Sequence, residues 1–200
     1  MVSFDRFTAV LDACVLFPMI VRDVLLTLAD HEFFNPRWSQ TIHDEWTRNL
    51  NAYRMAADSK GAASGQIAKI RATMDAAFPD APVVCELPEL ANLAPVDPKD
   101  RHVVMTALAA KADAIITFNT KDFAADHVRT HFGIDIIHPD DFALDLIDLN
   151  EKRAIAALKE LRKRKCRPSW TVEDLVERLR KSRMPQMALW LEAGDVRPLL

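Results

Sequence analysis

Four acidic residues are the side chains of this sequence best suited to chemistry: Asp12, Glu45, Asp100 and Asp122. Carboxylates that cluster in a cleft repel one another unless a cation neutralises them. Without histidine or cysteine partners, such a cluster suits a hard ion such as Mg²⁺ or Mn²⁺, which activates water and stabilises a phosphodiester under attack. The four acids therefore favour metal-dependent hydrolysis, provided that the fold brings them together.

Two predicted strands end at acids of this set. Residues 7–11 are apolar and β-prone and stop at Asp12, whereas the apolar run 114–118 gives way to the polar segment 119–122, which ends in Asp122. A short apolar run is the pattern of a parallel strand that is covered on both faces. Because open α/β sheets bind ligands at the carboxyl ends of their strands, both acids are expected at one edge of the sheet.

Two predicted helices carry the other acids. Asp97 followed by Pro98 predicts a helix N-cap with proline at the first helical position, which places Asp100 in the first turn. Ser39 is predicted to cap a long helix on which Glu45 lies among the residues of the packing face. Structural explanations also exist, because a helix dipole favours a carboxylate in its first turn and a helical Glu is commonly solvated.

The order of the elements predicts the fold class. Predicted strands at residues 7–11, 114–118 and 134–137 are separated by helical patterns. This alternation indicates a parallel, doubly wound α/β sheet with right-handed crossovers. Half of the 200 residues are hydrophobic, so we expect one domain with an appendage.

Composition narrows the class of protein further. The sequence has no run of about 18 apolar residues and no basic segment followed by an apolar one at its start, so we expect no membrane span, no signal peptide and a cytoplasmic location. Its three cysteines share no CxxC spacing. They support neither a disulfide framework nor a zinc site.

Charge is distributed unevenly along the chain. Residues 1–150 hold 13 Lys and Arg against 22 Asp and Glu, whereas residues 151–200 hold 13 against 7. We predict a main domain at residues 1–149 and a basic helical appendage at residues 150–200. A basic tail suits a polyanion or an acidic partner, although a solvated helix face explains the same charges equally well.

Three blocks of sequence together resemble a known family. Residues 10–18, 42–50 and 100–123 are similar to the signature blocks of PIN-domain proteins, especially VapC-type toxins. The resemblance covers about residues 7–142. It implies a PIN-like three-layer α/β/α sandwich with a central parallel sheet, a divalent-metal-dependent endoribonuclease that hydrolyses RNA, and an antitoxin encoded beside it. It does not decide between a monomer and a homodimer.

The resemblance also assigns roles by position. Asp12, Glu45 and Asp100 match the first three acids of the family. The fourth position is held by Asn119 in this chain, with Asp122 as the nearby replacement. By this resemblance, Asp12, Asp100 and Asp122 hold Mg²⁺ or Mn²⁺, and Glu45 orients or deprotonates the attacking water.

Further residues are weaker candidates around this site. Asn119, Arg48 and Arg22 are candidates for contacts with the substrate, the two arginines through its phosphates. Cys14 stands where many relatives have a small polar residue, often Asn.

Other classes of protein share parts of this pattern of acids. An aspartyl phosphatase also places Asp after the first strand, but it needs a second Asp two positions later, where this chain has Cys14. A receiver-like module needs adjacent acids and a lysine at a late strand end, which we do not find. A catalytically inactive PIN-like module that binds RNA or protein stays an alternative, because Asn119 replaces the commoner acid.

Overall fold

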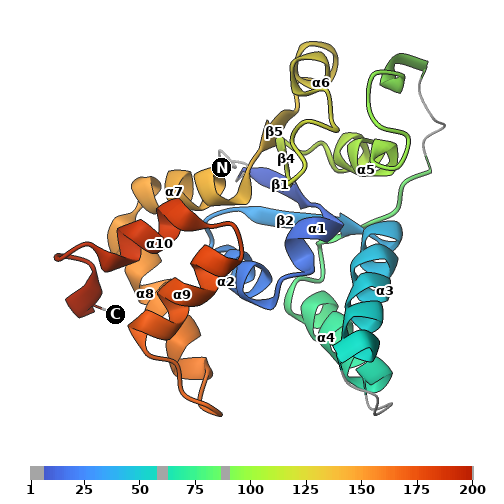
Figure 1. Ribbon diagram of the computed structural model, residues 1–200. Coiled ribbons are helices and arrows are strands. Elements are labelled where there is room, and N and C mark those ends of the chain that lie inside the picture. The colour runs from blue at the N-terminus through green and yellow to red at the C-terminus, as the bar shows by residue number, and fades with distance from the viewer. Residues whose placement is uncertain (1–6, 58–62, 87–90, 200) are drawn as a thin grey trace. The chain divides into compact units, whose positions relative to one another are not determined.

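The chain forms two compact units (Figure 1), and the computed structural model describes residues 7–57, 63–86 and 91–199. Unit one comprises the chain up to Phe17 together with Asn35–Ile136, and unit two comprises Pro18–Phe34 together with Ile137–Leu200. The chain therefore leaves unit one early, forms one segment of unit two, and then returns.

Unit one is built on a five-stranded sheet in the order β3-β2-β1-β4-β5. Strands β1 to β5 span, in chain order, Thr8–Leu11, Asn35–Ser39, Pro82–Val83, Ala114–Ile116 and Asp135–Ile137. Strand β1 pairs in parallel with β2 and with β4, and β2 pairs in parallel with β3. The central strand β1 is buried from its second residue onward, as its apolar sequence predicted. The predicted α/β class with a central parallel sheet is confirmed.

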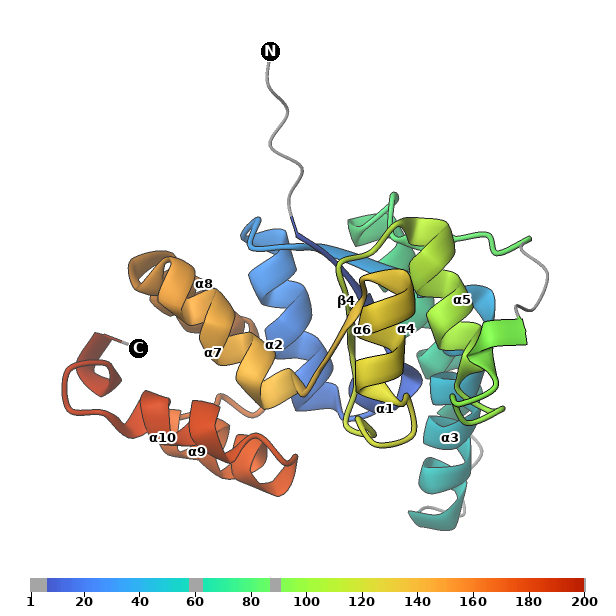
Figure 2. The ribbon, with the colours of Figure 1, turned by 90° about the horizontal axis from the view of Figure 1, so that it is seen from above.

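Helices of unit one pack on this sheet and on one another. Helices α1, α3, α4, α5 and α6 span Ala13–Leu16, Gln40–Ala57, Ala63–Ala77, Arg101–Ala110 and Ala125–Phe132, and a 3-10 turn η1 spans Ala91–Leu93. Helix α5 contacts β1, β2 and β4, and Figures 1 and 2 both show it beside these strands. Helix α5 thus packs against β1 and β4, the strands whose carboxyl ends were predicted to carry acids.

Unit two is helical. Helices α2, α7, α8, α9 and α10 span Met19–Asp30, Pro139–Leu149, Glu151–Arg164, Val172–Lys181 and Pro185–Glu192, and a 3-10 turn η2 spans Arg197–Leu199. Helix α2 contacts α7, α8 and α9, and α9 packs against α10. The predicted C-terminal helices are therefore present, and together with the sheet they confirm the PIN-like α/β/α fold class.

Two polar contacts join α8 to α2 in unit two. The Arg164 guanidinium donates to the Thr27 hydroxyl at 2.8 Å, and Lys165 forms an ion pair with Asp23. Part of the basic charge that the sequence places in the tail thus serves the packing of unit two.

A buried carboxylate joins two further helices of unit two. Asp140 in α7 is 1% exposed, and its two oxygens accept hydrogen bonds from the backbone N–H groups of Gln186, at 2.8 Å, and Met187, at 2.9 Å. Both N–H groups belong to the first turn of α10, where the helix dipole favours a negative charge. No helix among the described residues is long and apolar enough to cross a membrane.

Candidate active site

Asp12 follows β1 directly and lies at the carboxyl end of the sheet. Its backbone N–H donates to the Ile116 carbonyl at 3.1 Å, which extends the pairing of β1 with β4 by one residue. The side chain is 4% exposed, and its Oδ2 accepts hydrogen bonds from the Thr117 hydroxyl at 2.7 Å and from the Cys14 thiol at 3.0 Å. Two neutral donors therefore fix the direction of this carboxylate.

The Cys14 thiol supplies the second hydrogen bond to the Asp12 carboxylate. Burial, and after it the charge of Asp12, raises the pKa of this thiol, so it stays protonated and able to donate. The sulfur also accepts a hydrogen bond from the backbone N–H of Phe118 at 3.3 Å. Cys14 is thus a structural partner of Asp12.

Thr117 is the residue of this site that sequence reasoning missed. It is fully buried at the end of β4, and its hydroxyl also accepts the N–H of Asn119 at 3.0 Å. The register pairs Leu11 with Ile116, so Thr117 stands next to Asp12 on the neighbouring strand. The sequence signal for this role is that Thr117 is the one hydroxyl residue in the otherwise apolar run 114–118.

Helix α5 begins later than predicted. It starts at Arg101 with Asp100 as its N-cap, and Asp97 instead accepts a hydrogen bond on its carboxylate from the N–H of Lys99 at 2.9 Å. The assignment of Asp97 as the N-cap was wrong, because this side-chain turn competes with the helix for the same backbone groups. The N–H of Asp97 also donates to the Asp122 carbonyl at 2.9 Å, which ties the loop after β4 to this turn.

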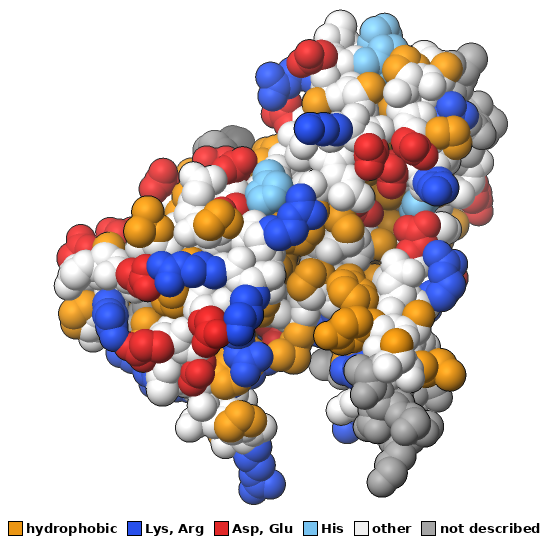
Figure 3. Space-filling model, viewed as in Figure 1, with side chains coloured by type: hydrophobic (Ala, Val, Ile, Leu, Met, Phe, Trp, Pro, Cys, Tyr) orange, Lys and Arg blue, Asp and Glu red, His pale blue; other side chains and the backbone are white. Residues whose placement is uncertain are grey.

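Three neighbouring carboxylates act on Asp100. Burial, and after it the charges of Asp12, Asp97 and Asp122, raises the pKa of Asp100 to about 6. The predicted acids Asp12 and Asp122 are therefore both within electrostatic reach of Asp100, although Asp122 itself is exposed. Figure 3 shows acidic side chains gathered on this face of unit one near α5.

Asp12 and Asp100 share an unusual property. Each is the N-cap residue of a helix, where a carboxylate normally accepts a hydrogen bond from the first turn, and neither makes such a bond. The carboxylates of Asp12 and Asp100 therefore do not serve as hydrogen-bonding caps of α1 and α5.

Glu45 reaches this region from α3 and meets His102 of α5. The Nε2 of His102 lies 3.2 Å from Oε2 of Glu45, a distance that suits an ion pair, although the geometry is not that of a hydrogen bond. The other ring nitrogen, Nδ1, lies 2.8 Å from the Lys99 carbonyl. A carbonyl can only accept, so Nδ1 carries a proton and the ring orientation is fixed.

The weaker candidates lie in different places. Asn119 is exposed in the loop after β4, and Arg48 is exposed on α3, one turn after Glu45. Arg22 belongs to α2 of unit two, where it is 4% exposed and its Nε lies 4.0 Å from Asp23. The contacts of these three residues with a substrate stay predictions.

The acids fit a hard divalent cation in chemistry and in charge. Oxygen donors suit Mg²⁺ and Mn²⁺, and a cation would relieve the repulsion that raises the pKa of Asp100. No group of three or more His, Cys, Asp and Glu side chains within the described ranges is already close enough to hold a metal ion.

Comparison with known proteins finds two family matches and one curated relative. Residues 8–121 match the family described as PIN domain, and residues 139–193 match the family described as VapC50 C-terminal domain. Over 90 residues, the chain is 36% identical to a curated protein of Mycobacterium tuberculosis (strain ATCC 25618 / H37Rv) named "Putative ribonuclease VapC50". That alignment covers 45% of this chain and 52% of the relative, so the chain spans about half the length of the curated relative that it matches. No solved structure matches the chain. Since the PIN match extends over more than half of the sequence and the parallel sheet carries acids at its strand ends, the chain belongs to the PIN domain family.

Proposed function

We propose that this chain is a divalent-metal-dependent endoribonuclease and the toxin of a toxin–antitoxin pair. One observation carries the proposal: Asp12 and Asp100 are N-cap residues whose carboxylates serve no cap and lie within electrostatic reach of each other. Membership of the PIN family and the name of the curated relative support the same activity.

Asp12, Asp100 and Asp122 would hold the ion, Mg²⁺ or Mn²⁺. When bound, such an ion neutralises these carboxylates and stabilises the charge that develops on the phosphate. Thr117 and Cys14 keep the Asp12 carboxylate in one orientation, so binding costs little rearrangement there.

Glu45 would orient the attacking water and accept its proton as general base. Its carboxylate lies against His102, whose ring is held by the Lys99 carbonyl. Asn119 and Arg48 would contact the RNA, the latter through phosphate. The partners in the proposal are the RNA substrate and an antitoxin.

The deciding experiment is cleavage of a mixed RNA pool with and without Mn²⁺. We expect Mn²⁺-dependent cleavage by the wild type and none by Asp12→Asn, because this substitution keeps the shape and removes the charge that the ion needs. Asp148→Asn, at an exposed acid of α7, is the matched control and keeps full activity.

Full cleavage by Asp12→Asn at saturating Mn²⁺ contradicts the metal site. RNA binding by the wild type without any Mn²⁺-dependent cleavage favours the inactive binding module, which the exposed Asn119 motivates.

A further inference from the structure

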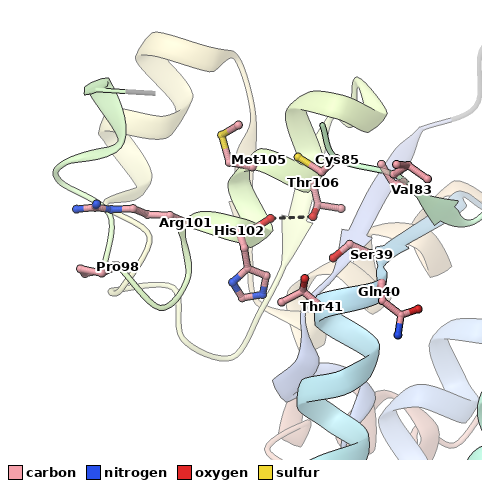
Figure 4. A pocket seen from close by; sticks show the side chains of 11 residues that line it. Ser39, Gln40, Thr41, Val83, Cys85, Pro98, Arg101, His102, Met105 and Thr106 are labelled. Atoms are coloured by element: carbon pink, nitrogen blue, oxygen red, sulfur yellow. Dashed lines mark hydrogen bonds between the residues drawn. The ribbon is translucent and has the colours of Figure 1, made fainter. Parts of the chain in front are cut away.

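Unit one contains a cavity of about 510 Å³ beside the acids. Residues from the end of β2, the start of α3, the segment from β3 to Cys85 and helix α5 line it, and Figure 4 shows these four parts around the space. Its volume lies in the range of about 300–1,000 Å³ that is typical of small-molecule sites. The cavity is therefore large enough for one nucleotide base.

The lining is amphipathic. Ser39, Thr41 and Thr106 bring hydroxyl groups, whereas Val83 and Met105 bring apolar surface. No Asp or Glu is found among the described lining residues. Neutral hydrogen-bonding groups next to apolar walls suit a flat, uncharged heterocycle.

A phosphate suits this lining poorly. The one cation among the described lining residues is Arg101, and its guanidinium donates to the carbonyls of Val96, at 3.1 Å, and Ala94, at 3.3 Å. Figure 4 shows its side chain directed away from Ser39 and Thr41. The Ser39 hydroxyl already accepts the N–H of Ile42 at the start of α3, at 3.3 Å.

His102 belongs both to the cavity and to the candidate active site. Its ring lines the cavity, and its Nε2 lies 3.2 Å from Oε2 of Glu45. Figure 4 shows the ring extending from α5 toward the start of α3, where Thr41 lies. A group bound in the cavity against this ring is thus adjacent to the acid proposed to activate water.

We propose that the cavity binds one base of the RNA substrate next to the bond that is cut, an inference that rests on the function proposed above. The His102 ring offers a face on which a base stacks, as aromatic side chains do in single-stranded RNA recognition. The Thr41 hydroxyl, which is exposed at the start of α3, donates to or accepts from the edge of the base. The cavity therefore selects among the four bases.

Two exposed cysteines provide a direct test. Cys85 lines the cavity, Cys166 is exposed in unit two, and Cys14 is unreactive because burial raises the pKa of its thiol. The probe protein is the full chain with Asp12→Asn, which prevents cleavage, and Cys166→Ser, which leaves Cys85 as the reactive thiol. The matched control carries Asp12→Asn and Cys85→Ser.

The measurement is the rate of alkylation by a fluorescent maleimide in the presence of each of the four ribonucleotide homotetramers. We expect the RNA to slow alkylation of Cys85 and to leave alkylation of Cys166 unchanged, with one tetramer acting at a lower concentration than the others. Thr41→Val is expected to weaken protection by that tetramer about two- to tenfold, the worth of one hydrogen bond. Thr130→Val, at an exposed position of α6, is expected to change nothing.

The proposal is overturned if no tetramer protects Cys85 at concentrations that saturate cleavage by the wild type. It is also overturned if ribose 5-phosphate protects Cys85 as well as the tetramers do, since the base would then not be read. Mn²⁺-dependent RNA cleavage by the wild type without protection of Cys85 would reject the base site and leave the proposed nuclease activity standing. Protection without Mn²⁺-dependent cleavage supports the base site and rejects the proposed activity.

Discussion

Two neutral groups donate hydrogen bonds to the Asp12 carboxylate, and no cation does so among the residues that the structure describes. The Thr117 hydroxyl and the Cys14 thiol both donate to its Oδ2. Such donors orient a carboxylate without neutralising it, so its charge stays available to a ligand. The orientation of the Asp12 carboxylate therefore depends in part on Thr117, at the end of the neighbouring strand β4.

Thr117→Val is expected to weaken Mn²⁺ activation. Valine has nearly the same shape, so the change leaves the packing of the strand end. It removes the hydrogen bond that the Thr117 hydroxyl donates to Asp12 and the one that it accepts from the N–H of Asn119. Loss of a partner that orients a ligand lowers metal affinity or activity by about 10- to 100-fold. The measurement is the Mn²⁺ concentration required for half-maximal RNA cleavage. Thr73→Val on α4, whose hydroxyl bonds only its own helix at Lys69, is the control, and identical activation curves for both variants would refute the role of Thr117.

Asp100→Asn is expected to stabilise the metal-free protein, and to do so more at high pH. The pKa of Asp100 rises from 3.8 to about 6 on folding, so the folded state disfavours its charge. Stability from this group is present at low pH and is lost as pH rises through about 6. Asparagine removes that loss, which develops between pH 3.8 and about pH 6. The gain in Tm in the presence of a chelator should therefore be clear at about pH 8 and small at about pH 3.5.

Asp148→Asn, at an exposed acid, is the control for this pH series. Equal gains in Tm for Asp100→Asn at both pH values would show that repulsion among the acids is not the cause. Excess Mn²⁺ should reverse the order, because only the wild type retains all the proposed ligands.

At the residue scale, the sequence predicted the strand-end acids and missed their neutral partners. Asp12 and Asp122 follow apolar runs, a pattern that is visible in any single sequence. The role of Thr117 depends on which residue of β4 lies opposite β1, and strand register is decided by packing across the whole sheet. The Cys14 thiol is only two residues from Asp12, but its direction depends on how the chain turns into α1.

At the element scale, the start of α5 shows how local turns compete with helices. Asp97 and Pro98 form a helix-start signal, yet the helix begins at Arg101 because the Asp97 carboxylate binds the N–H of Lys99. Strand β4 is also shorter than the apolar run 114–118, since the N–H of Phe118 donates to Cys14. The sequence predicts that these elements exist, and side-chain hydrogen bonds set their ends.

Asp97→Ala is expected to have a free energy of unfolding about 0.5–1.5 kcal/mol lower than Asp97→Asn, the net worth of one hydrogen bond. Both substitutions remove the charge that acts on Asp100, so their difference isolates the hydrogen bond to Lys99. Asp97→Asn is the matched control, because the amide oxygen can still accept from Lys99. Urea unfolding of the three proteins measures the difference, and equal losses for Ala and Asn would rule out the turn as the source of stability.

At the scale of the whole molecule, the chain does not divide at one point. Residues 8–121 match the PIN family as one stretch, yet Pro18–Phe34 within it belongs to unit two. Sequence reasoning placed a boundary between residues 149 and 150, and that boundary stays a prediction. A continuous sequence pattern does not reveal that one of its helices packs with segments more than a hundred residues away.

Removal of residues 139–200 is expected to produce an aggregating protein. Val21, Val24 and Leu25 of α2 are buried, and α2 packs against α7, α8 and α9. Deleting those helices exposes an apolar helix face, which promotes association. Size-exclusion chromatography of the truncated chain measures this, with the variant Val21→Ser, Leu25→Ser in the truncated background expected to recover monomer. A monomeric truncated chain without these changes would contradict the packing of α2.

The division of unit two between two distant segments also sets an order of events during translation. Every residue of unit one has been synthesised once Ile136 emerges from the ribosome, whereas α2 must wait for the segment that begins at Ile137. At about 5–20 residues per second, residues 137–200 take roughly 3–13 seconds to be synthesised. We therefore expect the acids of unit one to come together on the nascent chain while α2 still lacks its helical partners. During this stage, we expect chaperones to bind the apolar face of α2.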